Sequence, residues 1–157
     1  LKGVELARDV FLKWKDRTKS TATLIFVGQI KDLDLAAKLE TSNGVKCLGS
    51  VDRVTTLRIM RQAQMLLCCS ESEGLPRSCL EAIAIGLPCL LPMGVPEFDK
   101  YVPDWVMRSR DVDELADQLE DIFKVPGYYA DYPVQMHDIE NVVSKYYEAL
   151  FSLGLKT

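Results

Sequence analysis

Short apolar runs alternate with amphipathic segments along most of this chain, and that alternation restricts the folds open to it. Four apolar runs have the length and composition of strands, at residues 23–27, 45–48, 64–69 and 88–91. Segments with a helical spacing of apolar residues precede or separate them, at residues 3–16, 33–39, 53–62 and 76–85. Strands that alternate with helices indicate right-handed crossovers and a mostly parallel sheet. We therefore expect an α/β fold, a Rossmann-like open parallel sheet flanked by helices.

Further elements are expected before the first apolar run and after the fourth. The helical pattern at residues 3–16 comes before the first apolar run, where a regular alternation would place another strand. We therefore expect the chain to be a fragment whose first strand is missing. After the fourth run, the prolines and glycine of residues 92–103 predict a loop, and Trp105–Met107 predicts a brief fifth strand. Two further helices are expected, from Asp111 or Asp113 to about Phe123 and from about His137 to Leu153.

Two of these segments carry more detailed expectations. Thr23–Val27 is apolar almost throughout, which predicts a strand buried on both faces, as in parallel sheets. Asp52 predicts the N-cap of the helix at residues 53–62, because its carboxylate can accept hydrogen bonds from first-turn amides. The inward face of that helix is expected to carry its apolar residues, which are Val54, Leu57, Ile59 and Met60.

Composition narrows the class of protein further. A length of 157 residues suits a single domain, residues 1–157, and 48% hydrophobic with 27% charged residues is typical of a folded globular protein. The net charge of −4 argues against a nucleic-acid partner, since phosphate contacts need clustered lysine and arginine. No apolar run approaches the ~20 residues of a membrane helix, and no leader-like segment is present. We expect a cytoplasmic location, or one at the cytoplasmic face of a membrane.

The five cysteines are scattered, and no two of them have Cys-x-x-Cys spacing. Most lie in apolar runs, which predicts buried, reduced thiols. A cysteine nucleophile would need a base, and the single histidine, His137, stands in a polar stretch near the C-terminus. The spacing therefore gives a Cys–His couple no support. The cysteines are Cys47, Cys68, Cys69, Cys79 and Cys89.

The segment Ser70–Pro76 combines the features of an anion site. It leaves a predicted strand and enters a predicted helix, at the edge where open parallel sheets bind ligands. Gly74 allows a ligand close to the backbone, and Pro76 fits the first helical position, where an N–H is dispensable. A helix N-terminus of this kind is suited to a phosphate or another anion. The unpaired N–H groups of its first turn are expected to belong to Arg77, Ser78 and Cys79.

Two carboxylates flank this predicted anion site. Glu73 lies in the loop, and Glu81 stands among apolar residues in the helix. Carboxylates accept hydrogen bonds from vicinal hydroxyls, so the combination with anion donors suggests a nucleotide-sugar. The alternative is structural: Ser70 and Glu73 would form a capping box, and Glu81 would be a solvated helix residue. The spacing alone leaves both interpretations open.

The stretch from Ser70 to Pro88 resembles the signature of the family-4 retaining glycosyltransferases. That signature is Ser-x-x-Glu-Gly-x-Pro, a second Glu eight residues after the first, and then Glu-Ala-x-Ala-x-Gly-x-Pro; every position matches. The similarity covers nearly the whole chain and implies the C-terminal half of the two-domain GT-B architecture. Other segments that resemble the family are Lys2–Gly3, Phe26–Gly28, Val45–Gly49, Gly94–Glu97 and Asp111–Ala116.

The resemblance implies a role for each matching residue. Glu73 would accept hydrogen bonds from the transferred sugar, and Lys2 would neutralise the departing diphosphate. Glu81 would hold the ribose hydroxyls. Backbone N–H groups of the loop and first helical turn would face the sugar and diphosphate, and the base would lie near a second strand end. Those backbone positions are Gly74, Leu75, Arg77 and Ser78 for the diphosphate side, and Leu48 and Gly49 for the base.

The resemblance also implies an activity: transfer of a hexose from a nucleotide-diphospho-sugar to an acceptor glycan, lipid or small molecule, with retention of configuration. No cofactor beyond the donor substrate and no metal is implied. The acceptor-binding N-terminal domain is missing, so the fragment alone is expected to be inactive, and any membrane contact would come through that domain. The alternative that stays open is a non-catalytic nucleotide- or sugar-binding module, or a partner subunit with the same fold.

Overall fold

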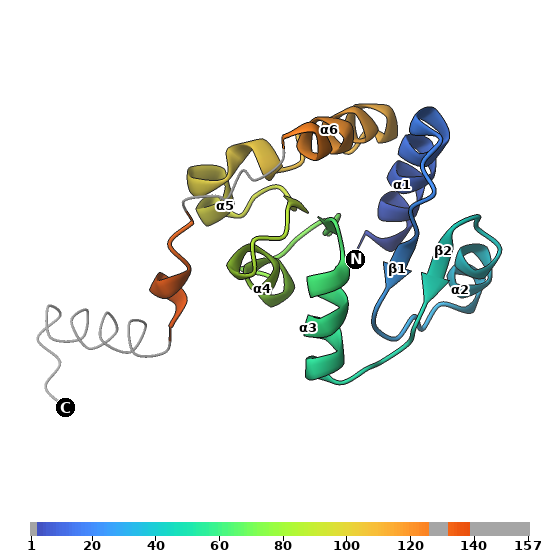
Figure 1. Ribbon diagram of the computed structural model, residues 1–157, viewed down its shortest axis with the longest axis horizontal. Coiled ribbons are helices and arrows are strands. Elements are labelled where there is room, and N and C mark those ends of the chain that lie inside the picture. Colours follow the sequence, from blue (N-terminus) through green and yellow to red (C-terminus); the bar gives the residue numbers. More distant parts are fainter. Residues whose placement is uncertain (1–2, 126–131, 139–157) are drawn as a thin grey trace, which may run out of the picture.

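The computed structural model describes residues 3–125 and 132–138. As far as β4, its helices and strands alternate in the order expected from the sequence (Figure 1). The α-helices are α1 (Val4–Thr18), α2 (Leu33–Glu40), α3 (Arg53–Gln62), α4 (Arg77–Ala84), α5 (Pro96–Tyr101) and α6 (Val112–Lys124). The strands are β1 (Leu24–Phe26), β2 (Val45–Cys47), β3 (Leu66–Leu67) and β4 (Cys89–Leu90), and the 3-10 helices are η1 (Pro103–Trp105) and η2 (Val134–His137).

The strands pair in parallel, as the alternation predicts. β1 pairs with β2, with Leu24 opposite Val45, and β3 pairs with β4, with Leu66 opposite Cys89. Within the described residues these are two separate ladders of two strands each. Figure 1 shows β1 and β2 side by side, with α2 next to them. β4 contacts both α4 and α6, so helices cover it from two sides, as in a Rossmann-like sheet.

Successive residues of a parallel strand point their backbone groups to alternate sides. In β1 the hydrogen bonds to the β2 side use Leu24 and Phe26, so the N–H and C=O of Ile25 point the other way. In β3 the amides of Leu66 and Cys68 donate to the β4 segment, so the backbone of Leu67 points away from β4. Each ladder therefore has a second edge, formed by Ile25 in β1 and Leu67 in β3.

Local capping chemistry sets the ends of several helices. The Asp52 carboxylate accepts a hydrogen bond from the Thr55 amide at 2.9 Å and caps α3, as predicted. Its bonds from the Thr55 hydroxyl and amide lower the pKa of Asp52. Asp111 caps α6 in the same way, through the amides of Asp113 and Glu114. These caps fix where α3 and α6 begin.

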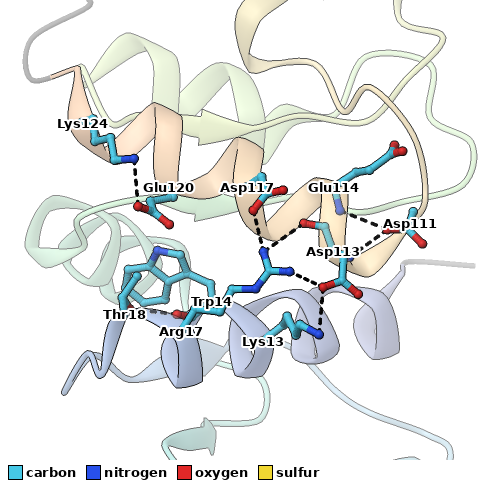
Figure 2. A network of polar contacts seen from close by, with 10 residues as sticks. All are labelled: Lys13, Trp14, Arg17, Thr18, Asp111, Asp113, Glu114, Asp117, Glu120 and Lys124. Carbon is cyan, nitrogen blue, oxygen red and sulfur yellow. Dashed lines mark hydrogen bonds and ion pairs between the residues drawn. The ribbon is translucent and has the colours of Figure 1, made fainter.

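The interface between α1 and α6 is the most extensive helix contact of the described chain (Figure 1). Trp14 stacks on Phe123, with ring centroids 5.0 Å apart and an interplanar angle of 14°. Beside this apolar contact, Lys13 lies 2.8 Å from Asp113, and Arg17 binds both Asp113 and Asp117 (Figure 2). The packing of α1 on α6 therefore combines buried aromatic stacking with a network of ion pairs beside it.

Three expectations about the fold are wrong. Residues 92–103 are not simply a loop, because they contain α5, whose first residue is Pro96; proline is tolerated in a first turn. Thr23–Val27 is not buried on both faces, since Ile25 is 41% exposed in a strand that has one partner within the described residues. Val54 is 58% exposed and does not face inward.

The expected fifth strand is reduced to a single parallel bridge between Leu91 and Val106, because Pro103–Trp105 forms η1 directly before it. The helix expected from about His137 to Leu153 falls almost entirely outside the described residues. His137 itself ends η2, where its ring nitrogen lies 2.8 Å from the Tyr132 hydroxyl. No helix among the described residues is long and apolar enough to cross a membrane.

Candidate functional site

The loop Ser70–Pro76 connects the carboxyl end of β3 with the start of α4, as predicted. Pro76 is the N-cap residue and not, as the sequence suggested, the first helical residue, and no side chain caps this helix. The Cys79 amide donates to the Pro76 carbonyl at 3.0 Å, so the expectation that Cys79 offers a free first-turn N–H is wrong. The bond joins residues that are three positions apart, so α4 begins with 3-10 geometry. Arg77 and Ser78, both exposed, are the first-turn amides that remain as candidates for an anion.

The loop presents backbone rather than bulky side chains before α4. Gly74 is exposed, and a Cβ at that position would meet no atom within 4 Å. Leu75 is 36% exposed. Glu73 is half-buried, in contrast to the exposed Glu71 and Ser72 before it. The loop therefore leaves room for a ligand above Gly74, with the carboxylate of Glu73 set deeper than its neighbours.

Glu81 is held in place by an arginine from another helix. Its side chain is 17% exposed, and its Oε1 atom lies 2.8 Å from Nη2 of Arg53, the first residue of α3. The alternative that Glu81 is a solvated helix residue is therefore wrong. This ion pair joins the segment that follows β2 to the helix that follows β3. The two strand ends that the sequence singled out are thus brought together through Arg53 and Glu81.

The ends of β1 and β2 are tied to each other by backbone hydrogen bonds. The Leu48 amide donates to the Phe26 carbonyl at 2.9 Å, and the Gly28 amide donates to the Gly49 carbonyl at 2.7 Å. The Leu48 side chain is 46% exposed, and a Cβ at Gly49 would meet no atom within 4 Å. Leu48 and Gly49 therefore form an open backbone surface at the carboxyl end of β2, before α3.

Gly3 fixes the start of α1 against the end of β3. Its φ is 65°, and a Cβ built on it would lie 1.8 Å from the Cys69 carbonyl oxygen. Only glycine fits so close a backbone approach in this conformation. Lys2, the predicted cation, lies outside the described residues. Its neighbour in the sequence, Gly3, contacts the backbone of Cys69 and Ser70, where the candidate loop begins.

Arg110 is a cation at this loop that the sequence pattern did not reveal. Its guanidinium nitrogens donate to the carbonyls of Cys69 and Ser70 at 3.4 and 3.5 Å, and it lies 3.8 Å from the Glu71 carboxylate. Arg110 stands 40 residues from Ser70 in a polar turn, so no local pattern could have linked the two. The contact stabilises the exit of the chain from β3, the point from which Glu73 is positioned.

Two cavities, of about 180 and 430 Å³, lie at the opposite end of the sheet, and Pro88, just before β4, lines both of them. Neither is lined by Glu73 or Glu81. Among the described residues, no group of three or more histidine, cysteine or acidic side chains could hold a metal ion. The candidate site is therefore the exposed loop and helix start at the carboxyl end of β3, with Glu81 and Arg53 beside it.

Comparison with known proteins identifies the family and the fold. Residues 1–136 match the family model of the group 1 glycosyl transferases. The solved structure of WaaG, a glycosyltransferase involved in lipopolysaccharide biosynthesis, is similar with a TM-score of 0.69 and 21% sequence identity. The match covers 94% of this chain but 42% of the WaaG chain, so this chain spans less than half the length of that protein. No curated protein sequence matches it.

These matches confirm two predictions. The structural likeness shows an α/β fold of the GT-B type, with parallel strands flanked by helices. The family match covers most of the chain, including the stretch from Ser70 to Pro88. The chain therefore belongs to the group 1 glycosyl transferases.

Proposed function

We propose that this chain is the donor-binding, C-terminal half of a retaining glycosyltransferase. It would bind a nucleotide-diphospho-sugar from which a hexose is transferred to a glycan, lipid or small-molecule acceptor. The observation that carries this proposal is the pairing of Glu81 with Arg53, which sets a mostly buried carboxylate beside an open helix N-terminus. Anion donors next to a positioned hydroxyl acceptor fit a nucleotide diphosphate with its ribose.

Each part of the donor has a candidate partner. The diphosphate would accept hydrogen bonds from the amides of Gly74, Leu75, Arg77 and Ser78. The ribose hydroxyls would donate to Glu81, whose Oε1 faces Arg53, and the sugar hydroxyls would donate to Glu73. The base would rest on the open backbone at Leu48 and Gly49. The support is that these positions follow the carboxyl ends of the parallel strands β2 and β3, and α/β sheets bind ligands at that edge.

The chemistry follows from charge. Breaking the bond between the sugar and the diphosphate places negative charge on the leaving diphosphate. Amide dipoles at the start of α4 and the ammonium of Lys2 would stabilise that charge as it develops, which lowers the barrier. The reaction would therefore need neither a metal nor another cofactor. We place the donor in the cytoplasm.

We also propose that residues 1–157 are one domain of a longer enzyme. The second edges of the two ladders, at Ile25 and Leu67, would take one further parallel strand that leads directly into α1 and joins them into one sheet. Gly3 supports this, because it starts α1 at the carboxyl end of β3, where such a strand would finish. The acceptor would bind to a separate N-terminal domain, through which any membrane contact would arise. Without that domain, the chain is expected to lack transferase activity.

The first test of the proposed function is Glu81→Ala. The loss of a charged acceptor for ribose hydroxyls is expected to weaken nucleotide binding tenfold or more, since hydrogen bonds to charged groups contribute about 1.5–3 kcal/mol each. Titration with UDP, GDP and ADP, followed through backbone amide shifts, measures the dissociation constants. The shifts are expected to centre on residues 73–81.

Glu71→Ala is the matched control, because Glu71 is an exposed acid of the loop before α4, and its cationic neighbour is Arg110. It removes the same negative charge as Glu81→Ala and is expected to change the affinity less than threefold. Arg53 is 66% exposed, so water can solvate it once Glu81 is gone and the variant should fold. Equal affinities for Glu81→Ala and the unaltered chain would contradict the donor-binding role.

The proposed further strand gives a second prediction. A segment of about five alternating valine and isoleucine residues, fused before residue 1, is expected to raise the melting temperature. It would hydrogen-bond to the backbones of Ile25 and Leu67 and cover Ile25, which is 41% exposed. Circular dichroism melting curves measure the effect. The control carries proline at the central position, which removes a ladder donor; if it melts as high as the first fusion, the strand proposal fails.

A further inference from the structure

The ion pair between Glu81 and Arg53 leaves the carboxylate able to accept hydrogen bonds. Nη2 of Arg53 lies 2.8 Å from Oε1 of Glu81. Oε1 is buried, and within the part of the chain that the structure describes no donor is aligned with it for a hydrogen bond. Arg53 therefore holds the carboxylate through charge. Since a carboxylate has about four lone-pair sites, hydroxyl groups of a ligand can still bind it.

The guanidinium of Arg53 is directed to Glu81 because the acid next to it in the sequence is engaged elsewhere. Both carboxylate oxygens of Asp52 bind Thr55: Oδ1 accepts from the Thr55 amide at 2.9 Å, and Oδ2 accepts from the Thr55 hydroxyl at 2.6 Å. Glu81 is the acid that lies within ion-pair distance of Arg53 among the described residues. The N-cap of α3 and the ion pair therefore use different carboxylates.

The position of Arg53 does not favour α3 itself. Arg53 is the first residue of α3, and the first turn of this helix contains no acidic residue. A helix N-terminus carries partial positive charge, so a cation does not stabilise it. Glu81, on α4, supplies the opposite charge from outside the helix. Arg53 therefore contributes through its contact with Glu81 rather than through the stability of α3.

The contact restrains Glu81 before a ligand arrives. The two side chains come from α3 and α4, so the positions of their backbones are set by two regular elements. A long side chain that is free to turn loses conformational entropy when a ligand fixes it. An acceptor that is already restrained avoids that loss, and its ligand binds more tightly.

We propose that Arg53 is a positioning residue for the donor and sets the preference of the site for nucleotides with both ribose hydroxyls. The inference rests on the proposed function, in which Glu81 accepts hydrogen bonds from these hydroxyls. Arg53 holds the Glu81 carboxylate in place, and the ribose hydroxyls donate to that carboxylate. Because Arg53 acts through Glu81 and not on the diphosphate, its effect is confined to ligands that carry the hydroxyls.

The test compares UDP, GDP and ADP with their 2′,3′-dideoxy analogues. Calorimetric titration gives the dissociation constants for the unaltered chain and for Arg53→Ala. The unaltered chain is expected to bind the tightest of the three nucleotides about tenfold more tightly than its analogue, since the hydroxyls bond to a charged acceptor. In Arg53→Ala this ratio should fall about fivefold, within the range of coupling between residues in contact, while the affinity for the analogue stays nearly the same.

Three further variants separate positioning from other roles. Arg53→Lys keeps the charge and should retain most of the ratio, because the contact is an ion pair without an aligned hydrogen bond. Arg58→Ala removes an exposed arginine of the same helix and should leave the ratio unchanged. Adding Arg53→Ala to Glu81→Ala should not lower the ratio further, since the residue that Arg53 positions is already gone.

The outcomes distinguish this inference from the proposed function. If the unaltered chain binds none of the three nucleotides, or binds the dideoxy analogues equally well, the proposed function fails and the role of Arg53 fails with it. If the unaltered chain discriminates and Arg53→Ala keeps the full ratio, only the role of Arg53 is overturned. The same holds if Arg53→Ala weakens both ligands equally, as the loss of a direct phosphate contact would.

The variants are expected to fold, because the Arg53 side chain is 66% exposed. Circular dichroism checks each of them. Arg53→Gln removes the charge with a smaller change of shape, and it decides the point if Arg53→Ala does not fold.

Discussion

Gly3→Ala should destabilise the chain by about 2–5 kcal/mol. An L-residue at a φ of 65° costs roughly 1–2 kcal/mol in strain. The new methyl group would also lie 1.8 Å from the Cys69 carbonyl oxygen and 2.3 Å from its carbonyl carbon. These are backbone atoms at the end of β3, so no side-chain rotation relieves the overlap, and overpacking of this kind typically costs about 1–3 kcal/mol more.

Gly49→Ala separates the two contributions. Gly49 has nearly the same φ, 66°, but a Cβ there would meet no atom within 4 Å. It should therefore lose only the roughly 1–2 kcal/mol of backbone strain. Urea denaturation followed by circular dichroism gives both free energies of unfolding. Equal losses in the two variants would show that the contact between Gly3 and Cys69 does not restrict the start of α1.

Trp14→Ala is expected to reduce the free energy of unfolding by about 3–5 kcal/mol, the usual range for a buried aromatic residue replaced by alanine. Trp14 is 8% exposed, stacks on Phe123 and lies 6.1 Å from the ring of Phe11. Removing it leaves a cavity between α1 and α6, and the ion pairs of Arg17 beside it are too exposed to compensate.

Trp14→Phe is the control for this prediction. Among the described residues the buried Nε1 atom of Trp14 has no hydrogen-bond partner, so phenylalanine removes a buried polar group and keeps a ring against Phe123. We expect a loss of about 1–2 kcal/mol, from the smaller volume alone. Circular dichroism is the appropriate signal, because both substitutions alter fluorescence. A loss for Trp14→Phe as large as for Trp14→Ala would contradict the role given to ring stacking.

The sequence predicts those parts of the fold that depend on neighbouring residues. Asp52 and Asp111 cap helices whose first turns are within three residues of them, so local chemistry determines where α3 and α6 begin. Composition does not reveal α5, because a segment rich in proline and glycine is typical of a loop, although proline is compatible with a first turn. The exposure of Ile25 and Val54 depends on which elements pack against them, and periodicity does not contain that information.

The residues of the candidate site also fall into two groups, those that the sequence predicts and those that it does not. Glu73, Gly74 and Glu81 stand in one continuous motif, so their placement around the start of α4 could be predicted. The partners that position them could not. Arg53 reaches Glu81 from another helix, and Arg110 reaches Ser70 from 40 residues away. Contacts of this kind depend on tertiary packing, which brings distant side chains together after the elements have formed.

The packing of α1 on α6 has a consequence for the order of folding. Arg17 and Asp117 are separated by 100 positions in the chain. Closing a loop of that length costs on the order of 4 kcal/mol of chain entropy, and contacts between α1 and α6 can offset this cost only after the loop has closed. During synthesis, Trp14 therefore cannot stack on Phe123 until the ribosome has released α6, so this contact forms late. A nascent chain stalled before residue 112 would lack the helix that covers Trp14.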